Sequence, residues 1–349
     1  MKLAILGTRG VPASYGGFET FAEELGRRLA ERGHDVTVYG RTGFVDPALG
    51  RYRGMRLVVL PALYTKHLET VSHTFLGAIH AMGQGFDAVL LCNAANAPFA
   101  RILQLGGTPV ALNVDGLERK RRKWGLAGRA YYQLCERLAA SVPDTLITDA
   151  EVIRRYYRRC FGARSEMIVY GGDLERPAGT ATLDRLGVTP GEYLLYVSRF
   201  EPENNPDRVA QAYARVAGER PLVMVGGAPY ARELTERVRT LADRRVLLPG
   251  PIYGEGYREL LFGCRLYIHA TEVGGTHPAL VEAMGASRPV LYYDTPENRE
   301  VVADAGRRAA QERLSARGGR LEQQQESTHI LDLQSSHGQV DRYGHNVGR

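Results

Sequence analysis

Residues 266–302 read LYIHATEVGGTHPALVEAMGASRPVLYYDTPENREVV and decide the fold, because an apolar segment is followed by a glycine turn and then by a helical pattern. LYIHA predicts the end of a buried parallel strand, and VGGTH predicts a loop. Pro278 predicts the first helical position, which tolerates a missing N–H, and the amides of Ala279 and Leu280 are expected to face the loop. A helix start attracts negative charge, so GGTH is a candidate anion site. Glu282, one turn inside the helix, can accept hydrogen bonds from ligand hydroxyls.

The chain begins with a similar strand, loop and helix. KLAILG predicts a strand, TRGVPASYGG a loop, and FETFAEELGRRLAERG a helix that ends at Gly33. Five more strands are predicted at HDVTVYGR, MRLVVLPA, FDAVLLCN, TPVALNVD and DTLITDA. Helical patterns such as HTFLGAIHAMGQG and RAYYQLCERLAA fall between several of them. Strands that alternate with helices indicate a parallel, doubly wound sheet.

A second series follows the turn-rich residues 174–192. The strands YLLYVSRF, PLVMVGG, RVLLPG, RLYIHA and RPVLYYD are separated by the helical patterns DRVAQAYARVAG, YARELTERVRTLA and YGEGYRELLFG. We therefore predict an α/β protein with two tandem Rossmann-like domains, residues 1–173 and 193–306, joined by a linker at residues 174–192. Ligands bind at the carboxyl ends of the strands in such sheets, so the domains are expected to face each other across a cleft. Residues 307–349 contain eight large apolar side chains among 43 residues and predict an irregular, disordered tail.

Composition narrows the class of protein. A chain of 349 residues favours two domains. No segment approaches the roughly 20 apolar residues that span a bilayer, and the first residues do not resemble a signal peptide, so we expect a cytoplasmic protein. The net charge of +6 is concentrated in residues 119–164, which contain 12 Lys or Arg and 4 Asp or Glu. Such a surplus can attract nucleic acid, anionic lipid or phosphorylated substrates. The four cysteines lack the paired spacing of a zinc site or a disulfide framework.

Four motifs in order, GTRGVPASYGGFETFAEEL, NVDGLERKRRKW, RFEPENN and VGGTHPALVEAM, resemble GT-B glycosyltransferases, and within them the retaining GT4-type family. More narrowly, they look like the rhamnosyltransferases of bacterial surface-polysaccharide assembly. The resemblance spans residues 1–305. It implies a hexosyltransferase that moves rhamnose from dTDP-rhamnose, with retention, onto a lipid-linked or saccharide acceptor. It also implies that the first domain binds the acceptor and the second binds the nucleotide sugar. GTRGVPA lacks the G-x-G-x-x-G pattern, which argues against an NAD enzyme.

The resemblance implies several donor-binding residues. Gly16 and Gly17 match the loop that approaches the donor diphosphate, where the missing side chain permits a close approach; a simple turn is the alternative. Arg199 matches an arginine that contacts the diphosphate, a role suited to a bidentate guanidinium. The lysine that usually follows is absent, and we assign Asn204 of the matching stretch to the donor site. Glu282 matches a glutamate that holds the nucleotide ribose, although an exposed helical glutamate is an alternative.

The glycine loop departs from the family pattern. A first glutamate that contacts the sugar in relatives is replaced by Gly274, and Glu272 lies two residues too early to take its place. We therefore expect the sugar to be recognised through backbone amides of Gly274 and Gly275 and through Thr276 or His277.

Asp115 and Glu118 in NVDGLE are the candidate catalytic residues. Asp115 stands where many relatives carry a histidine close to the sugar and the leaving diphosphate. Its carboxylate can accept a hydroxyl hydrogen bond or act as a base, and a turn role for the Asp-Gly pair is an equal alternative. Retaining transfer mainly requires stabilisation of the leaving-group charge, so no nucleophile, cofactor or metal ion is expected, and the nucleotide sugar is a substrate.

The segment ERKRRKW places five consecutive cations beside a tryptophan. This composition predicts an acceptor-side patch that contacts an anionic membrane carrying a lipid-linked acceptor, so the protein is expected to be peripheral on the inner face of the cell membrane. Nucleic-acid binding is the rival interpretation, but interleaved aromatic residues are few and no nucleic-acid partner is expected. The predicted patch comprises Arg119, Lys120, Arg121, Arg122, Lys123 and Trp124.

Two other functions remain open. A GT-B nucleotide-sugar epimerase would need acid and base residues that the sequence does not reveal. A catalytically silent scaffold that binds a nucleotide sugar or lipid is favoured by the missing glutamate and lysine. The tail also favours it, because relatives usually end with helices that pack across both domains.

Overall fold

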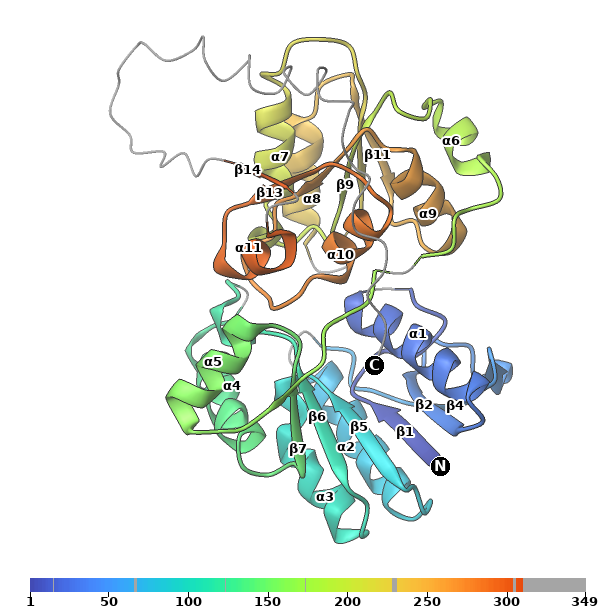
Figure 1. Cartoon of the computed structure of the whole chain (residues 1–349), viewed down its shortest axis with the longest axis vertical. Helices are drawn as coiled ribbons and strands as arrows, with labels where there is room; N and C mark the ends of the chain where they lie inside the picture. The colour runs from blue at the N-terminus through green and yellow to red at the C-terminus, as the bar shows by residue number, and fades with distance from the viewer. Residues whose placement is uncertain are drawn as a thin grey trace, which may run out of the picture.

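The computed structural model describes residues 1–309 apart from residues 15, 66–67, 123, 173, 228–230 and 304–305. Figure 1 shows two α/β domains, one above the other, each built on its own sheet. The expected architecture of two tandem Rossmann-like domains is confirmed. Most of the predicted tail, residues 310–349, lies outside the described residues.

The first domain contains an eight-stranded sheet in the order β3-β4-β2-β1-β5-β6-β7-β8. All neighbouring strands are parallel except β3 and β4, which form a short antiparallel pair. The strands are β1 (Lys2–Leu6), β2 (Asp35–Arg41), β3 (Arg51–Tyr52), β4 (Met55–Leu60), β5 (Ala88–Cys92), β6 (Val110–Val114), β7 (Thr145–Thr148) and β8 (Glu166–Met167). The helices are α1 (Gly17–Glu31), α2 (Glu69–Met82), α3 (Ala100–Leu105), α4 (Leu126–Ala139) and α5 (Glu151–Phe161), with 3₁₀ turns η1 (Pro47–Leu49), η2 (Ala94–Phe99) and η3 (Glu118–Lys120).

Helices cover both faces of this sheet. Along β1, Ala4 and Leu6 join a core that includes Ala78 of α2, whereas Ile5 joins Ala22 of α1 in a separate core. Side chains alternate between the two faces of a strand, so a strand covered on both sides must be apolar throughout. This explains why the first strand, KLAIL, is nearly continuous in apolar residues.

The second domain contains a six-stranded sheet in the order β11-β10-β9-β12-β13-β14, in which all paired strands are parallel. α7 and α8 cover one face, and α6, α9 and α10 cover the other. The strands are β9 (Leu194–Val197), β10 (Leu222–Val225), β11 (Val246–Gly250), β12 (Leu266–His269), β13 (Val290–Tyr293) and β14 (Arg307–Ala309). The helices are α6 (Ala181–Leu186), α7 (Pro206–Tyr213), α8 (Arg232–Leu241), α9 (Gly254–Gly263), α10 (Pro278–Gly285) and α11 (Pro296–Val302), with the 3₁₀ turn η4 (Pro202–Asn204).

Several short elements were not predicted. β3 and β8 have two residues each, too few to show a period of two. α5 carries four arginines and buries only Ile153 and Tyr157, so its apolar stripe is narrow. Two elements lie in segments expected to be irregular: α6 falls within the predicted linker, and β14 begins at the first residue of the predicted tail, where it pairs with β13.

Candidate functional site

Three loops from the carboxyl ends of β6, β7 and β12 meet between the two domains. Glycine permits this contact, because a Cβ on Gly116 would lie 2.8 Å from the Gly274 carbonyl carbon, and one on Gly275 would lie 2.4 Å from the Asp115 carbonyl oxygen. The Thr276 amide donates to Asp149 Oδ2 at 2.9 Å, and the Thr276 hydroxyl donates to the Asp149 carbonyl at 2.8 Å. The predicted sugar-binding loop therefore rests on two strand ends of the opposite domain.

Two carboxyl groups lie at this junction. Burial and the charge of Glu118 raise the pKa of Asp115 to about 7, against the opposing charges of Arg121 and Arg199. Burial and the charge of Asp115 raise the pKa of Asp149 to about 8. Both groups can therefore carry or release a proton near neutral pH. The sequence analysis did not single out Asp149, although this residue lies at the end of the predicted strand DTLITDA, at the same sheet edge as Asp115.

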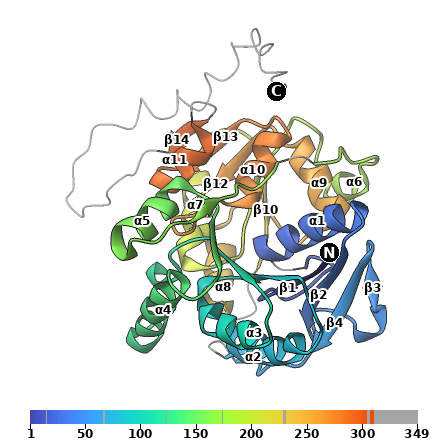
Figure 2. The ribbon, with the colours of Figure 1, turned by 60° about the horizontal axis from the view of Figure 1, so that its bottom comes forward.

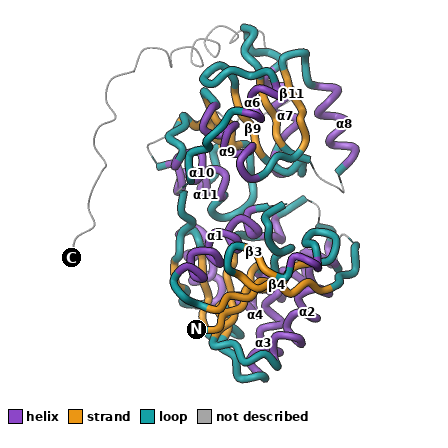
Figure 3. Tube along the Cα trace, turned by 90° about the vertical axis from the view of Figure 1, so that its right-hand side faces the viewer, coloured by secondary structure: helices purple, strands orange, loops and turns teal. Residues whose placement is uncertain are grey.

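The first glycine loop faces the start of α10. Gly16 precedes α1, and a Cβ on Gly17 would lie 3.0 Å from Pro278 Cγ. Figure 3 shows α1 directly opposite α10. The structure therefore brings the loop matched to the donor diphosphate against the helix start that was predicted as an anion site.

Within α10, the predicted start at Pro278 is confirmed. The expectation that the Leu280 amide faces the loop is wrong, because this amide donates to the His277 carbonyl at 2.9 Å and closes the first turn. Glu282 is not an exposed helical glutamate. Its side chain is buried and accepts a hydrogen bond from the Tyr257 hydroxyl at 2.6 Å. Burial raises the pKa of Glu282, and the Tyr257 hydrogen bond opposes this shift.

His277 packs beneath the glycine loop and is partly exposed. Its ring is 4.9 Å from that of His269, and a Cβ on Gly274 would lie 2.2 Å from His277 Cε1. Burial and the neighbouring His269 hold the pKa of His277 well below its usual value, so the ring is neutral at pH 7. This ring supports the loop from within the second domain.

The loop after β9 carries Arg199 and Asn204. Arg199 lies 3.5 Å from Glu201 as an ion pair and retains 29% side-chain exposure. The Asn204 amide donates to the Arg199 carbonyl at 2.7 Å, and the Tyr196 hydroxyl donates to the Asn204 carbonyl. In this arrangement Asn204 shapes the backbone that presents Arg199.

The predicted membrane patch is corrected at Arg121, which is buried between the domains. Its guanidinium contacts Glu118 at 2.6 Å, Glu203 at 3.2 Å and Glu201 at 3.4 Å. Burial alone would lower the pKa of Arg121, but these three carboxylates raise it above the usual value and keep the side chain charged. Arg121 is therefore an interdomain ion-pair residue and cannot face a lipid surface.

The rest of that patch does not form one surface. Arg119 pairs with Glu136 at 3.0 Å within the first domain, and Arg122 pairs across the domains with Glu272 at 2.9 Å. Trp124 packs against another aromatic ring, with 5.0 Å between centroids. Lys120 is exposed, and Lys123 lies outside the described residues.

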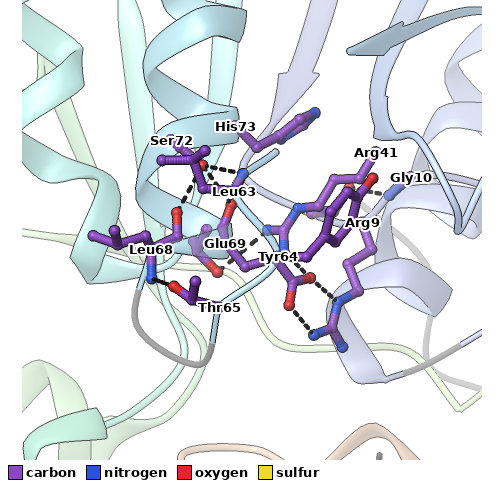
Figure 4. A network of polar contacts seen from close by, with 12 residues as sticks. Arg9, Gly10, Arg41, Leu63, Tyr64, Thr65, Leu68, Glu69, Ser72 and His73 are labelled. Carbon is purple, nitrogen blue, oxygen red and sulfur yellow. Dashed lines mark hydrogen bonds and ion pairs between the residues drawn. The ribbon is translucent and has the colours of Figure 1, made fainter. Parts of the chain in front are cut away.

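A buried polar network was not foreseen at the ends of β1 and β2 (Figure 4). Glu69 accepts hydrogen bonds from Arg9 at 2.8 and 3.1 Å and from Arg41 at 2.7 Å, and His73 contacts the carbonyl of Gly40 at 2.9 Å. Burial alone would raise the pKa of Glu69, but the two arginines hold it below its usual value. These residues belong to no contiguous motif, and they meet because β1 pairs with β2 and α2 packs against the sheet.

Two further properties concern the part of the chain that the structure describes. There, no helix combines the length and apolar character needed to cross a bilayer. Within the same residues, no group of three or more His, Cys, Asp or Glu side chains is arranged to hold a metal ion.

Solved structures with a similar fold include three carbohydrate-related proteins. Sucrose-phosphate synthase from Thermosynechococcus elongatus has a TM-score of 0.72 at 17% identity, over 89% of this chain and 86% of that protein. Anabaena HepE in complex with UDP-glucose has a TM-score of 0.69 at 17% identity, over 95% and 88%. WaaG, a glycosyltransferase involved in lipopolysaccharide biosynthesis, has a TM-score of 0.66 at 16% identity, over 89% and 86%. No curated protein matches the chain.

Two family models match in tandem: a glycosyl transferase 4-like domain over residues 16–171 and a glycosyl transferases group 1 domain over residues 191–317. The chain is a GT-B glycosyltransferase. The expected enzyme class, a GT4-like hexosyltransferase, is confirmed at this level. In this glycosyltransferase the loops that meet between the domains form the candidate active site.

Proposed function

We propose that this glycosyltransferase moves a sugar from a nucleotide donor, with retention, onto a hydroxyl of a lipid-linked or saccharide acceptor. The observation that carries the proposal is the junction of Asp115, Asp149 and the loop at residues 274–276, within the electrostatic reach of Arg199. The loop to which we assign donor binding and a titratable carboxyl group of the first domain thus lie together.

The chemistry assigned to these residues is mainly electrostatic. As the bond from the acceptor oxygen to the anomeric carbon forms, the bond from that carbon to the diphosphate oxygen breaks. Arg199 and the backbone near Gly17 and Pro278 would stabilise the negative charge on the departing diphosphate. The acceptor hydroxyl and the departing diphosphate lie on the same face of the sugar. The acceptor proton passes to Asp115 or to the departing phosphate oxygen. A pKa near 7 suits Asp115 to accept this proton. The proposal assigns no metal ion or cofactor.

We assign dTDP-rhamnose as the donor and surface-polysaccharide assembly as the setting. The support is the resemblance of four ordered motifs to rhamnosyltransferases. UDP-glucose is the competing donor, because the similar fold of Anabaena HepE has been solved with that molecule.

For a lipid-linked acceptor we propose peripheral contact with an anionic membrane through α4 and α5. These helices are adjacent, since Tyr156 of α5 donates to Glu136 of α4 at 2.6 Å. The leucines at 126 and 134 on α4 are 87% and 53% exposed. α5 adds exposed cations, so the surface combines apolar and basic groups, as interfacial helices do. The exposed arginines of α5 are Arg154, Arg155, Arg158 and Arg159.

The decisive experiment measures donor binding and product formation separately. Thermal shift with dTDP-rhamnose, UDP-glucose and their free nucleotides identifies the donor, and lipid-linked or saccharide acceptors then test transfer. Glu282→Ala should weaken donor binding about tenfold, corresponding to the loss of one hydrogen bond accepted by a carboxylate. Full donor affinity in this variant would refute the assignment of Glu282.

Donor binding without product would favour the silent scaffold, and conversion of the nucleotide sugar without an acceptor would favour an epimerase. For the membrane surface, flotation with anionic liposomes should fall when Arg155 and Arg159 are both changed to Glu. Arg244→Glu is the control, since this exposed arginine lies in the second domain. Equal flotation of all three proteins would refute the α4–α5 assignment.

A further inference from the structure

The second domain holds the junction between β7 and α5 from two sides. On one side, Thr276 donates its amide and its hydroxyl to Asp149. On the other side, the Glu300 carboxylate of α11 accepts hydrogen bonds from the backbone amides of Glu151 and Val152 at 2.5 and 2.9 Å. Figure 2 shows α11 beside α5. The first turn of α5, whose amides lack helical partners, is therefore capped by a carboxylate from the opposite domain.

The glycine loop at residues 274–276 depends on this junction for its shape. Two of its three residues have no side chain, and glycine backbone adopts many conformations unless contacts select one. Thr276 supplies the only side chain, and its hydroxyl is already bonded to Asp149. Gly275 sits between the Asp115 carbonyl and the Asp149 carboxyl group, since a Cβ there would lie 2.4 and 2.6 Å from their oxygens. Contacts from the first domain thus restrain the loop.

Asp149 combines complete burial with one unpartnered oxygen beside the loop. Its Oδ1 has no hydrogen-bond partner among the described residues. A buried polar atom without a partner is costly, whereas Oδ2 is satisfied by the Thr276 amide, a bond that an asparagine carbonyl could also accept. The unpartnered oxygen lies on the side of Gly275, next to the loop that the resemblance assigns to the sugar.

We propose that Asp149 is a positioning residue that sets the sugar-binding conformation of residues 274–276 from the opposite domain. Recognition of the sugar part of the donor then requires docked domains, whereas recognition of the nucleoside diphosphate does not. This inference rests on the proposed function, because it takes the loop to be part of the donor site. It distinguishes Asp149 from Asp115, which is assigned to the reacting hydroxyl.

The test compares Asp149→Ala and Asp149→Asn with the control Glu300→Gln. Glu300 supports the same helix start but does not contact the glycine loop, so its variant reports general loosening of the domain contact. Asp149→Ala should raise the donor KM about tenfold, the effect of the one lost hydrogen bond to Thr276, and should leave the affinity for the free nucleoside diphosphate within about twofold. Asp149→Asn should have a donor KM close to that of the wild type, because the asparagine carbonyl oxygen can still accept a hydrogen bond from the Thr276 amide. Glu300→Gln should leave the ratio between the donor KM and the dissociation constant of the free nucleoside diphosphate unchanged.

A second measurement does not depend on catalysis. In the ligand-free protein, amide hydrogen exchange at residues 275–276 should become about tenfold faster in Asp149→Ala and stay unchanged in Glu300→Gln. Unchanged exchange at these amides, or equal losses of nucleoside diphosphate and nucleotide sugar affinity, would overturn the proposal. If exchange responds but no nucleotide sugar binds, loop positioning by Asp149 stands and the proposed function fails.

Discussion

Removal of the Arg121 side chain should destabilise the protein strongly. This guanidinium is 8% exposed and pairs with three carboxylates, of which Glu203 is fully buried and Glu201 and Glu118 are 12% and 11% exposed. Arg121→Ala leaves these negative charges together without their central cation. Loss of one partner from a buried ion pair typically costs about 3–5 kcal/mol, because the remaining charge is not compensated. We expect a loss of this size in the free energy of unfolding.

Arg122→Ala is the matched control. This neighbouring arginine also pairs across the domains, with Glu272 at 2.9 Å, but its side chain is 53% exposed. Exposed ion pairs contribute at most about 1 kcal/mol, since water and salt screen them. The two variants remove the same side chain from adjacent positions and differ in burial and in the number of carboxylates left without their partner.

Urea unfolding followed by circular dichroism at pH 7 measures both changes. A second variant separates uncompensated charge from lost packing: in the Arg121→Ala background, Glu203→Gln removes the buried negative charge and should recover about 1–2 kcal/mol. The reasoning fails if Arg121→Ala costs no more than Arg122→Ala. It also fails if Glu203→Gln destabilises the Arg121→Ala protein further.

Three further predictions concern single side chains. The pKa of about 8 at Asp149 lies above that of an unfolded carboxyl group, so the folded state keeps a proton that the unfolded chain loses from about pH 4 upward. The contribution of Asp149 to stability should therefore fall between about pH 4 and pH 8. Asp149→Asn should gain stability relative to the wild type over that interval in urea titrations; a constant difference would contradict the shift. Gly7→Ala should cost about 2–4 kcal/mol, because Gly7 has φ +95° and a Cβ there would lie 2.3 Å from the Cys92 carbonyl. Gly33→Ala, with φ +83° and open space, should cost only about 1 kcal/mol, and equal unfolding free energies would exclude the steric explanation. Tyr257→Phe should cost about 1.5–3 kcal/mol, since the hydroxyl bonded to Glu282 is lost, and an unchanged urea midpoint would show that this bond contributes nothing.

Local patterns predicted most of the fold. The apolar run of strands such as KLAIL and the start of α10 at Pro278 are properties of short segments, and the structure confirms them. Elements without a local pattern were missed. β14 begins in a segment poor in apolar residues, so only its pairing with β13 makes it a strand.

The candidate site divides in the same way. The sequence itself determined the glycine loops, Arg199 and Asp115, because each lies beside a strand or helix that its own neighbours specify. Only the tertiary structure decided that the Arg121 side chain points between the domains, that Glu282 is buried and that Asp149 contacts Thr276. Arg121 and Glu203 are 82 positions apart, and Asp149 and Thr276 are 127 apart. Such contacts depend on how two sheets dock, and no local period, charge run or turn pattern contains that information.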